Sequence, residues 1–270
     1  MDVASYLQRI GYAGTCDPTV GTLRQLHRAH LQSVPFENLD IPLGRPIVLA
    51  LPALFEKVVL RRRGGFCYEL NGLFAWLLRE LGFRVDMLSG RVFGPGGPGR
   101  EFAHMLLVVD AGARLAADVG FGDSFVEPIP LGGDGQGQPG HSYRVVERSE
   151  GWRLERRLPE SDWEPQYAFT TTPHALDAFR PMCDYHQTSP DSTFTRKSVC
   201  SRATPAGRVT LANGRLIVTS DGRRQERMVA TTEEYRALLE AHFRIDLGEE
   251  AEKAMKPALG TASGAPGDDG

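Results

Sequence analysis

In the first third of the chain, apolar residues and an occasional histidine recur at the spacing of α-helices. Leu23 and Leu26 are followed by His30, and this run ends before Pro35. Side chains three or four residues apart share one face of a helix, which they can turn toward a core. The pattern predicts that residues 1–83 are mainly helical.

Two further helices are expected in this region. One opens at Pro52, and the other begins around Cys67 and has the clearest periodicity. Its apolar positions fall at intervals of three and four residues: Leu70, Leu73, Phe74, Leu77 and Leu81. Gly82 is suited to cap this helix in the left-handed conformation, with Phe83 packing behind it.

From residue 84 onward the apolar spacing changes to two. Short apolar runs alternate with Gly and Pro at 84–93, 102–109, 114–121, 142–148, 152–158 and 166–170. Alternation of this kind predicts strands, and the regular turn signals favour a β-meander or barrel. Residues 171–192 are expected to be irregular.

The last part of the chain predicts strands followed by a helix. Asn213-Gly214 lies inside the stretch 193–230 and favours a two-residue hairpin turn. A helix is expected over 231–243, which opens on Thr and Glu residues. Residues 256–270 are rich in Gly, Ala, Pro and Asp, and we expect them to be disordered.

Charge and composition exclude several classes of function. The 270 residues carry a net charge of -3, which gives no electrostatic footprint for nucleic acid or an anionic membrane. No apolar run approaches the roughly 20 residues that span a bilayer. The first residues lack a secretory signal, and the 4 cysteines are too scattered for a disulfide framework. We therefore expect a cytoplasmic protein.

Cys67 is the strongest candidate nucleophile. It follows Arg63-Gly-Gly-Phe, so two glycines permit a sharp turn just before the predicted helix. A thiol at a helix N-terminus lies at the positive end of the helix dipole, which stabilises a thiolate. The free amides of the first turn can also stabilise an oxyanion.

A base and its orienting group are expected on two neighbouring strands. His104 and Asp118 are each a lone polar residue in an apolar run. A three-residue loop over 110–112 pairs Val109 with Ala113 and places His104 directly opposite Asp118. Directly opposed residues have Cβ atoms about 4.5–5.5 Å apart, so Asp118 can hold the imidazole, which in turn stabilises the Cys67 thiolate.

Four motifs in order resemble the arylamine N-acetyltransferase family. They are Ser33-Val-Pro-Phe-Glu-Asn-Leu39, Arg63-Gly-Gly-Phe-Cys67, the His104 strand and Asp118-Val-Gly-Phe-Gly122. The resemblance implies an α+β fold with a helical bundle (1–83), a central β-barrel (84–192), and a C-terminal α/β lid (193–255) before the tail (256–270). A cysteine-protease-like triad lies between the first two parts.

The resemblance also implies acetyl-CoA as acyl donor and ping-pong transfer to an arylamine, arylhydrazine or related aromatic amine. Phe36, Tyr68, Phe121 and Phe194 match the aromatic pocket for a flat acceptor, and Glu37 and Arg63 are a structural ion pair that steadies the cysteine loop. Ala103 departs from the Thr that some members have before the catalytic His. Residues that bind the coenzyme cannot be matched, and nothing indicates the oligomeric state.

Other functions are weighed beside this one. An amide synthase of macrolactam biosynthesis uses the same triad, as does a thiol hydrolase or transglutaminase-like enzyme. A non-catalytic binding module could keep the fold. Cys183, His186 and Cys200 lack the paired spacing of a zinc site, so we expect no metal. The expected partners are small molecules.

Overall fold

Helices at the N-terminus surround the segment that leads to Cys67. The structure, a computed structural model, describes residues 1–138 and 140–259. Its first helical elements are α1 (Val3–Ile10), α2 (Val20–Ser33), α3 (Leu51–Phe55), the π-helix η1 (Glu56–Leu60) and α4 (Cys67–Glu80). Side-chain oxygens of Asp2 and Thr19 cap the starts of α1 and α2. The predicted helical region is confirmed, and the helix expected from Pro52 continues as a π-helical turn.

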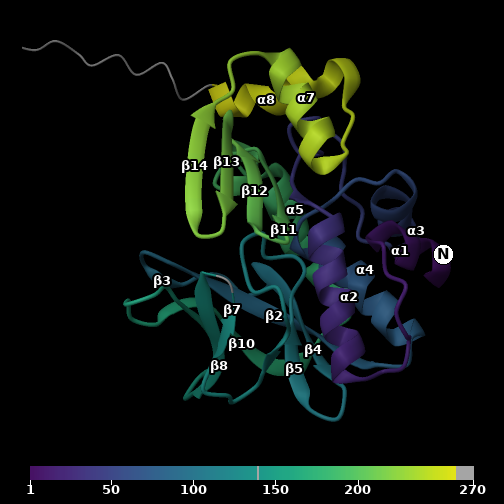
Figure 1. Cartoon of the computed structure of the whole chain (residues 1–270), viewed down its shortest axis with the longest axis vertical. Helices are drawn as coiled ribbons and strands as arrows, with labels where there is room; N and C mark the ends of the chain where they lie inside the picture. The colour runs from purple at the N-terminus through teal and green to yellow at the C-terminus, as the bar shows by residue number, and fades with distance from the viewer. Residues whose placement is uncertain (139, 260–270) are drawn as a thin grey trace, which may run out of the picture.

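The middle of the chain is a nearly closed antiparallel barrel (Figure 1). Its strands lie in the order β6-β5-β4-β2-β10-β9-β8-β7, and β3 pairs with β2 outside that path. A bridge between Leu131, which follows β6, and Val145 in β8 brings the β6 end of the sheet back against its other side. The bounds are β2 (Arg84–Gly94), β3 (Gly97–Pro98), β4 (His104–Asp110), β5 (Arg114–Ala117), β6 (Ile129–Pro130), β7 (Gln136–Gln138), β8 (His141–Arg148), β9 (Gly151–Arg157) and β10 (Glu164–Pro173).

A second sheet and two helices form the C-terminal part, drawn green to yellow in Figure 1. The elements are β11 (Val199–Thr204), β12 (Gly207–Ala212), β13 (Arg215–Ser220), β14 (Arg223–Met228), α7 (Thr232–Phe243), the 3₁₀ turn η3 (Gly248–Glu250) and α8 (Ala251–Leu259). Ala212 pairs with Arg215, so the predicted Asn213-Gly214 hairpin turn is confirmed. The edge strand β1 (Phe36–Glu37) comes from the N-terminal region and pairs with β11.

Residues 171–192 are more regular than expected. The 3₁₀ turn η2 (Leu176–Phe179) leads into α5 (Arg180–Thr188), and α6 (Thr193–Arg196) follows. The prediction was wrong because α5 buries only Cys183, so it lacks the apolar stripe from which helices are recognised. Pro181 in its first turn is a start signal that periodicity does not register.

The C-terminal boundary also differs from the prediction. Helix α8 runs to Leu259, so residues 256–259, expected to be disordered, continue a helix. Buried Ala251, Ala254 and Met255 hold that helix against the core under the second sheet. Residues 260–270 lie outside the described residues. The division of the chain into domains at residues 83, 192 and 255 remains a prediction.

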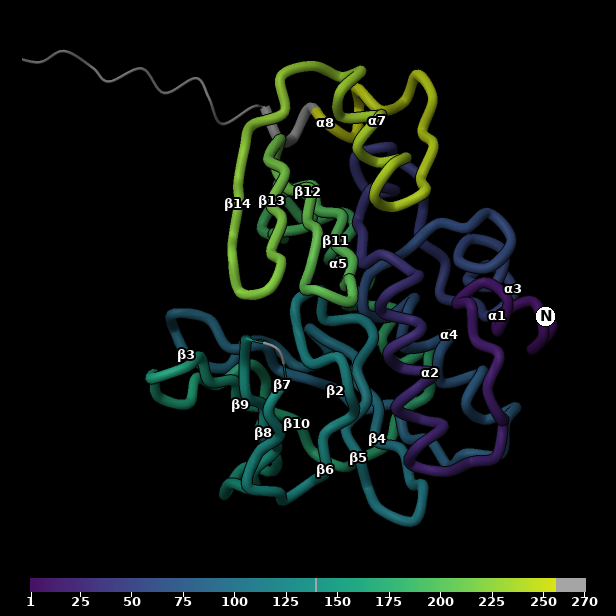
Figure 2. Tube along the Cα trace, in the orientation of Figure 1, coloured from purple at the N-terminus to yellow at the C-terminus, as the bar shows by residue number. Residues whose placement is uncertain are grey.

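The helical region and the barrel share one apolar core beneath the start of α4. Helix α4 lies against β2 and β4, and the core runs from Leu70, Leu73 and Phe74 to Met105 and Leu107 without a break. In the view of Figure 2 the traces of α2 and α4 run beside each other, and the rings of His27 and His30 on α2 contact Phe74 on α4. The first turn of α4 therefore faces the start of β4 and the loop after β5.

Candidate active site

Cys67 begins α4 at the end of a tightly packed glycine pair. A Cβ on Gly64 would lie 2.0 Å from the carbonyl oxygen of Pro35, and one on Gly65 would lie 2.7 Å from Oε2 of Glu69. The chain can pass this point only without side chains. Glu69 accepts the Phe66 N–H at 3.0 Å, which fixes the helix start and the position of Cys67.

The environment of the Cys67 sulfur is enclosed. Only 4% of the residue is exposed. Burial raises the pKa of the thiol, and backbone N–H groups of Met105 and Tyr68 offset part of that effect. Burial therefore opposes the effect of the helix start on this sulfur, and a thiolate at Cys67 remains a prediction.

The hairpin between β4 and β5 differs from the predicted register. The prediction paired Val109 with Ala113, whereas Val109 pairs with Leu115. Asp110 stays in the strand, and its Oδ1 accepts the Gly112 N–H at 3.0 Å. This side-chain turn moves the loop by one position, so Gly112, at φ 88°, lies at its centre.

The two candidate partners nevertheless meet. The register shift is two residues, so every side chain keeps its face of the sheet. Strand β5 ends at Ala117, and Asp118 turns back from there toward the start of β4. Nε2 of His104 lies 2.7 Å from Oδ2 of Asp118.

Asp118 receives four hydrogen bonds on its carboxylate. Oδ2 binds His104 and the Tyr167 hydroxyl, the latter at 3.0 Å. Oδ1 accepts from Asn71 Nδ2 at 2.8 Å and from the Gly120 N–H at 2.9 Å. Burial alone raises the pKa of this carboxyl. The charge of His104 and these hydrogen bonds lower the pKa by more than burial raises it, so the net shift is downward. Asp118 is held as a carboxylate.

Asn71 and Tyr167 are site residues that the sequence reasoning missed. Asn71 is four residues after Cys67 and therefore on the same face of α4; that spacing was a usable signal. Tyr167 comes from β10, with no local motif to mark it.

Cys67 meets the His104–Asp118 pair through two close backbone contacts. A Cβ on Gly120 would lie 2.7 Å from Cys67 Cα, so the loop carrying Asp118 lies directly on the start of α4. The backbone of Met105, the neighbour of His104, lies near enough to the Cys67 sulfur to lower the pKa of the thiol. The elements that carry the three sequence-predicted residues, α4, β4 and the loop after β5, therefore meet at this point.

Aromatic side chains surround this point. The Phe121 ring lies 5.0 Å from the His104 ring, and the Phe36 ring lies 6.3 Å from that of Phe194. Tyr68 is fully buried and donates its hydroxyl to the Phe102 carbonyl at 2.7 Å. Phe36, Phe121 and Phe194 keep partial exposure, whereas Tyr68 packs its ring against Phe66 and Phe179.

His186 is a further neighbour that the sequence reasoning did not place here. Its ring lies 5.1 Å from Phe194 and 6.2 Å from Tyr68. Nδ1 lies 3.2 Å from Ser192 Oγ, and Nε2 lies 3.4 Å from the carbonyl oxygen of Ala103. Burial lowers the pKa of this imidazole.

Glu37 and Arg63 belong to a larger buried group, which we call the acid–base cluster: Glu37, Asp40, Lys57, Arg63 and Glu69. Arg63 Nη2 lies 2.8 Å from Glu37 Oε1 and 2.9 Å from Asp40 Oδ1. Lys57 Nζ lies 2.7 Å from Asp40 Oδ2 and 2.7 Å from Glu69 Oε1. The cluster thus links the turn before Cys67 to η1, to β1 and to the first turn of α4.

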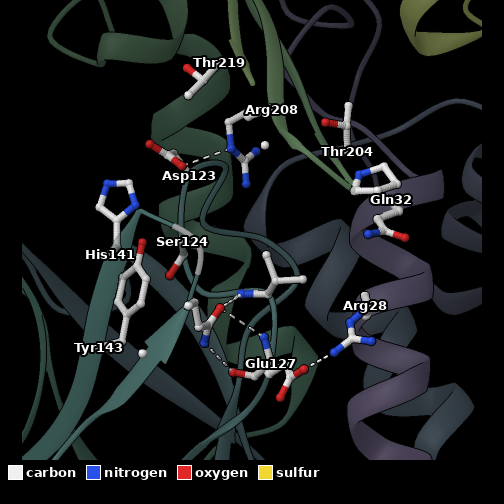
Figure 3. A pocket seen from close by; sticks show the side chains of 15 residues that line it. Arg28, Gln32, Asp123, Ser124, Glu127, His141, Tyr143, Thr204, Arg208 and Thr219 are labelled. Atoms are coloured by element: carbon white, nitrogen blue, oxygen red, sulfur yellow. Dashed lines mark hydrogen bonds and ion pairs between the residues drawn. The ribbon is translucent and has the colours of Figure 1, made fainter. Parts of the chain in front are cut away.

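A cavity of about 440 Å³ lies between the barrel and the C-terminal sheet. Figure 3 shows Arg208 paired with Asp123 on one side and Arg28 paired with Glu127 on the other. None of Cys67, His104 and Asp118 lines it. The loop over residues 123–127 forms its wall, and Gln138 binds the backbone of Val126 and Glu127 within that loop.

Over residues 1–138 and 140–259, no group of three or more His, Cys, Asp and Glu side chains is placed to hold a metal ion. In the same residues, every helix is too short or too polar to cross a membrane.

Comparisons with known proteins agree with the sequence motifs. Residues 19–252 match the family model described as N-acetyltransferase. An arylamine N-acetyltransferase of Mycolicibacterium smegmatis is 37% identical over 258 residues, which cover 92% of this chain and 94% of the relative. Proansamycin X synthase of Amycolatopsis mediterranei is 34% identical, covering 88% of this chain and 95% of that one.

Solved structures resemble the fold over nearly the whole chain. The arylamine N-acetyltransferase of Mycobacterium marinum in complex with CoA has a TM-score of 0.87 at 31% identity, covering 95% of this chain and 98% of that one. The family match over residues 19–252 and these near full-length similarities settle the classification. The chain is an acyltransferase that belongs to the arylamine N-acetyltransferase family.

Proposed function

We propose that the chain transfers an acetyl group from acetyl-CoA to an aromatic amine or hydrazine through an acetyl-Cys67 intermediate. The observation that carries the proposal is the His104–Asp118 hydrogen bond of 2.7 Å beside the enclosed Cys67 sulfur. A nucleophile, a base and a group that orients the base are the parts that covalent acyl transfer requires. We assign these roles to Cys67, His104 and Asp118.

The first half of the reaction acylates the enzyme. His104 uses Nε2 for Asp118, which leaves Nδ1 to take the Cys67 proton. The thiolate attacks the thioester carbonyl, and the amides at the start of α4 stabilise the oxyanion. The C–S bond to CoA then breaks, and the imidazolium returns its proton to the departing CoA sulfur.

The second half discharges the acetyl group. The amine nitrogen attacks the acetyl carbonyl of Cys67, His104 accepts the amine proton, and the amide leaves as the thiol forms again. Because burial raises the pKa of the Cys67 thiol, a base has to take its proton, and we assign that role to His104. We assign the acceptor pocket to Phe36, Phe121 and Phe194, with Tyr68 behind them.

Similar proteins support this reading. The M. smegmatis relative bears the name of the activity, and the M. marinum structure is a complex with CoA. The four cysteines are free, which is compatible with work in the reducing cytoplasm, the compartment that we propose.

A second candidate is amide synthesis in macrolactam formation. Proansamycin X synthase is similar over 95% of its own length, and the same three residues would join a thioester-bound acyl chain to an aromatic amine. A thiol hydrolase or transglutaminase-like activity is a third possibility. It predicts rapid hydrolysis of acetyl-CoA by the protein alone.

Mass spectrometry after brief mixing with acetyl-CoA tests the proposal. An adduct of about 42 Da on the Cys67 peptide, discharged by an added arylamine, is expected for ping-pong catalysis. Cys67→Ser should abolish it, whereas Cys183→Ser, which removes a second buried thiol, should retain it. Arylamine acetylation without any adduct would reject the mechanism. An adduct that water removes as fast as the amine does would favour hydrolysis.

A further inference from the structure

His27, on α2, contacts the candidate site from outside the barrel. Its Nε2 lies 3.0 Å from the Asp118 backbone N, and its Nδ1 lies 2.8 Å from the Val126 carbonyl oxygen. The carbonyl can only accept and the backbone N–H can only donate. The ring is therefore neutral, with its hydrogen on Nδ1 and with the lone pair of Nε2 accepting the Asp118 N–H.

The Asp118 N–H depends on this contact. Strand β5 ends at Ala117, so the ladder with β4 supplies no partner for the next residue. Asp118 is 1% exposed, which leaves water unable to replace the missing acceptor. Leaving a buried N–H unpaired is unfavourable, so without His27 the backbone at Asp118 would turn to find another partner.

The same ring holds the far end of the loop. It stacks on Phe125 with the ring centroids 5.6 Å apart and the planes at 7°, next to the carbonyl of Val126 that it binds. Between these two anchors lie Gly120, which packs on Cys67, and Phe121, whose ring meets His104. One neutral histidine thus fixes both ends of the loop that carries the orienting carboxylate.

We propose that His27 is a positioning residue for acyl transfer, which sets the pose of Asp118 against His104 by accepting the Asp118 backbone N–H. The inference rests on the proposed function of the Cys67, His104 and Asp118 set. His27 touches no reacting atom and acts through Asp118. Burial lowers the pKa of His27 to about 4, so Nε2 stays unprotonated at neutral pH and keeps the lone pair that accepts the Asp118 N–H.

Two amide substitutions separate the two hydrogen bonds of the ring. In His27→Gln the side-chain oxygen reaches the position of Nε2 and keeps an acceptor for Asp118. In His27→Asn the shorter amide reaches only the position of Nδ1 and keeps the bond to Val126. His27→Leu removes both bonds while keeping an apolar volume in the core.

The test measures kcat and KM for arylamine acetylation, with the melting temperature of each variant. We expect a roughly 10- to 100-fold lower kcat in His27→Asn and His27→Leu, with KM for acetyl-CoA within about two-fold, and a kcat within about three-fold of the parent in His27→Gln. His30→Asn is the matched control. His30 is equally buried one turn along α2, its Nδ1 meets the Tyr6 hydroxyl at 2.9 Å, and we expect a loss of stability with kcat unchanged.

Three results would overturn the inference: the reverse order of His27→Gln and His27→Asn, no change in kcat in any variant, or losses that follow melting temperature and are matched by His30→Asn. Cys67→Ser separates this failure from that of the proposed function. If Cys67→Ser abolishes transfer while the His27 variants all keep the kcat of the parent, only the inference fails. If Cys67→Ser retains transfer, the proposed function fails first.

Discussion

Two buried polar groups flank the start of α4, and they are built on different principles. On one side a single carboxylate, Asp118, is surrounded by a histidine and neutral donors. On the other, the acid–base cluster sets three carboxylates against Lys57 and Arg63. Neutral donors let a nearby imidazole gain and lose a proton at small cost, whereas fixed opposite charges lock their partners in place.

The comparison suggests a division of labour around Cys67. The Asp118 side is suited to proton transfer, and the acid–base cluster is suited to holding the turn at Gly64 and Gly65. Substitutions on the first side should therefore act mainly on kcat, and those on the second mainly on the free energy of unfolding.

The largest effect is expected for Asp118→Asn. The amide keeps the shape but cannot hold His104 in the tautomer that faces Cys67, so kcat should fall roughly 10³- to 10⁴-fold. Steady-state kinetics with an arylamine checks this. Asp40→Asn is the counterpart in the acid–base cluster and should leave kcat within about ten-fold. Equal kcat losses in the two variants would erase the proposed distinction.

Arg63→Met is next in size and should act on stability. It leaves Glu37 buried without its cation, and breaking a buried ion pair from one side costs about 3–5 kcal/mol. Urea unfolding measures the loss. Arg61→Met, two positions away in an exposed pair with Glu56, is the control and should change stability by less than about 0.5 kcal/mol. A small loss in Arg63→Met would show that the cluster is not a rigid support.

The pH dependence of stability should reveal His27. Its folded pKa of about 4 lies below the usual value of 6.5, so the unfolded chain binds the proton more readily. The stability that the neutral ring contributes is complete above pH 6.5 and is lost as the pH falls toward 4. The full difference is about 3 kcal/mol.

Urea unfolding at pH 7.5 and 4.5 compares the parent with His27→Gln. The variant should lose less stability on acidification, by about 2–3 kcal/mol. Parallel losses in the two proteins would mean that His27 does not stay neutral in the fold. Other buried groups with shifted pKa values, among them His30 and Glu69, are present in both proteins and cancel in the comparison. Asp118, whose pKa is lowered, loses its own contribution only below the usual carboxyl range.

Tyr167→Phe should have the smallest effect of the series. It removes one of four donors to Asp118 without changing the core volume, and we expect a roughly 10-fold lower kcat at nearly unchanged stability, the scale of one hydrogen bond to a charged group. Kinetics and a melting curve on the same sample decide it. A loss as large as that of Asp118→Asn would mean that the tyrosine takes part in proton transfer itself.

The main residues of the site could be predicted from the sequence, but the geometry between them could not. Glycines before Cys67 and lone polar residues in apolar strands are local signals, and they pointed to Cys67, His104 and Asp118. The register between the strands was wrong because the Asp110 side chain builds its own turn, a choice that depends on one rotamer. The burial of the thiol could not be predicted either, since burial is a property of the assembled core.

Long-range partners could not be predicted from local pattern. Tyr167 reaches Asp118 from β10, and His27 reaches it from α2. Neither residue stands in a motif, and each distance depends on how the barrel meets the helices. Helix α5 was not predicted for a related reason, because a mostly exposed helix shows little periodicity of apolar residues.

The short strand β1 has a consequence for how the chain is made. Phe36 and Glu37 pair with Ser201 and Cys200, and Asn38 binds the backbone at Phe194, Lys197 and Val199. A ribosome adding 5–20 residues per second takes on the order of ten seconds to travel from one side of this pairing to the other. During that interval the nascent chain carries the partner of Arg63 on an unpaired edge. The sheet that holds Glu37 in place can therefore be completed only late in synthesis.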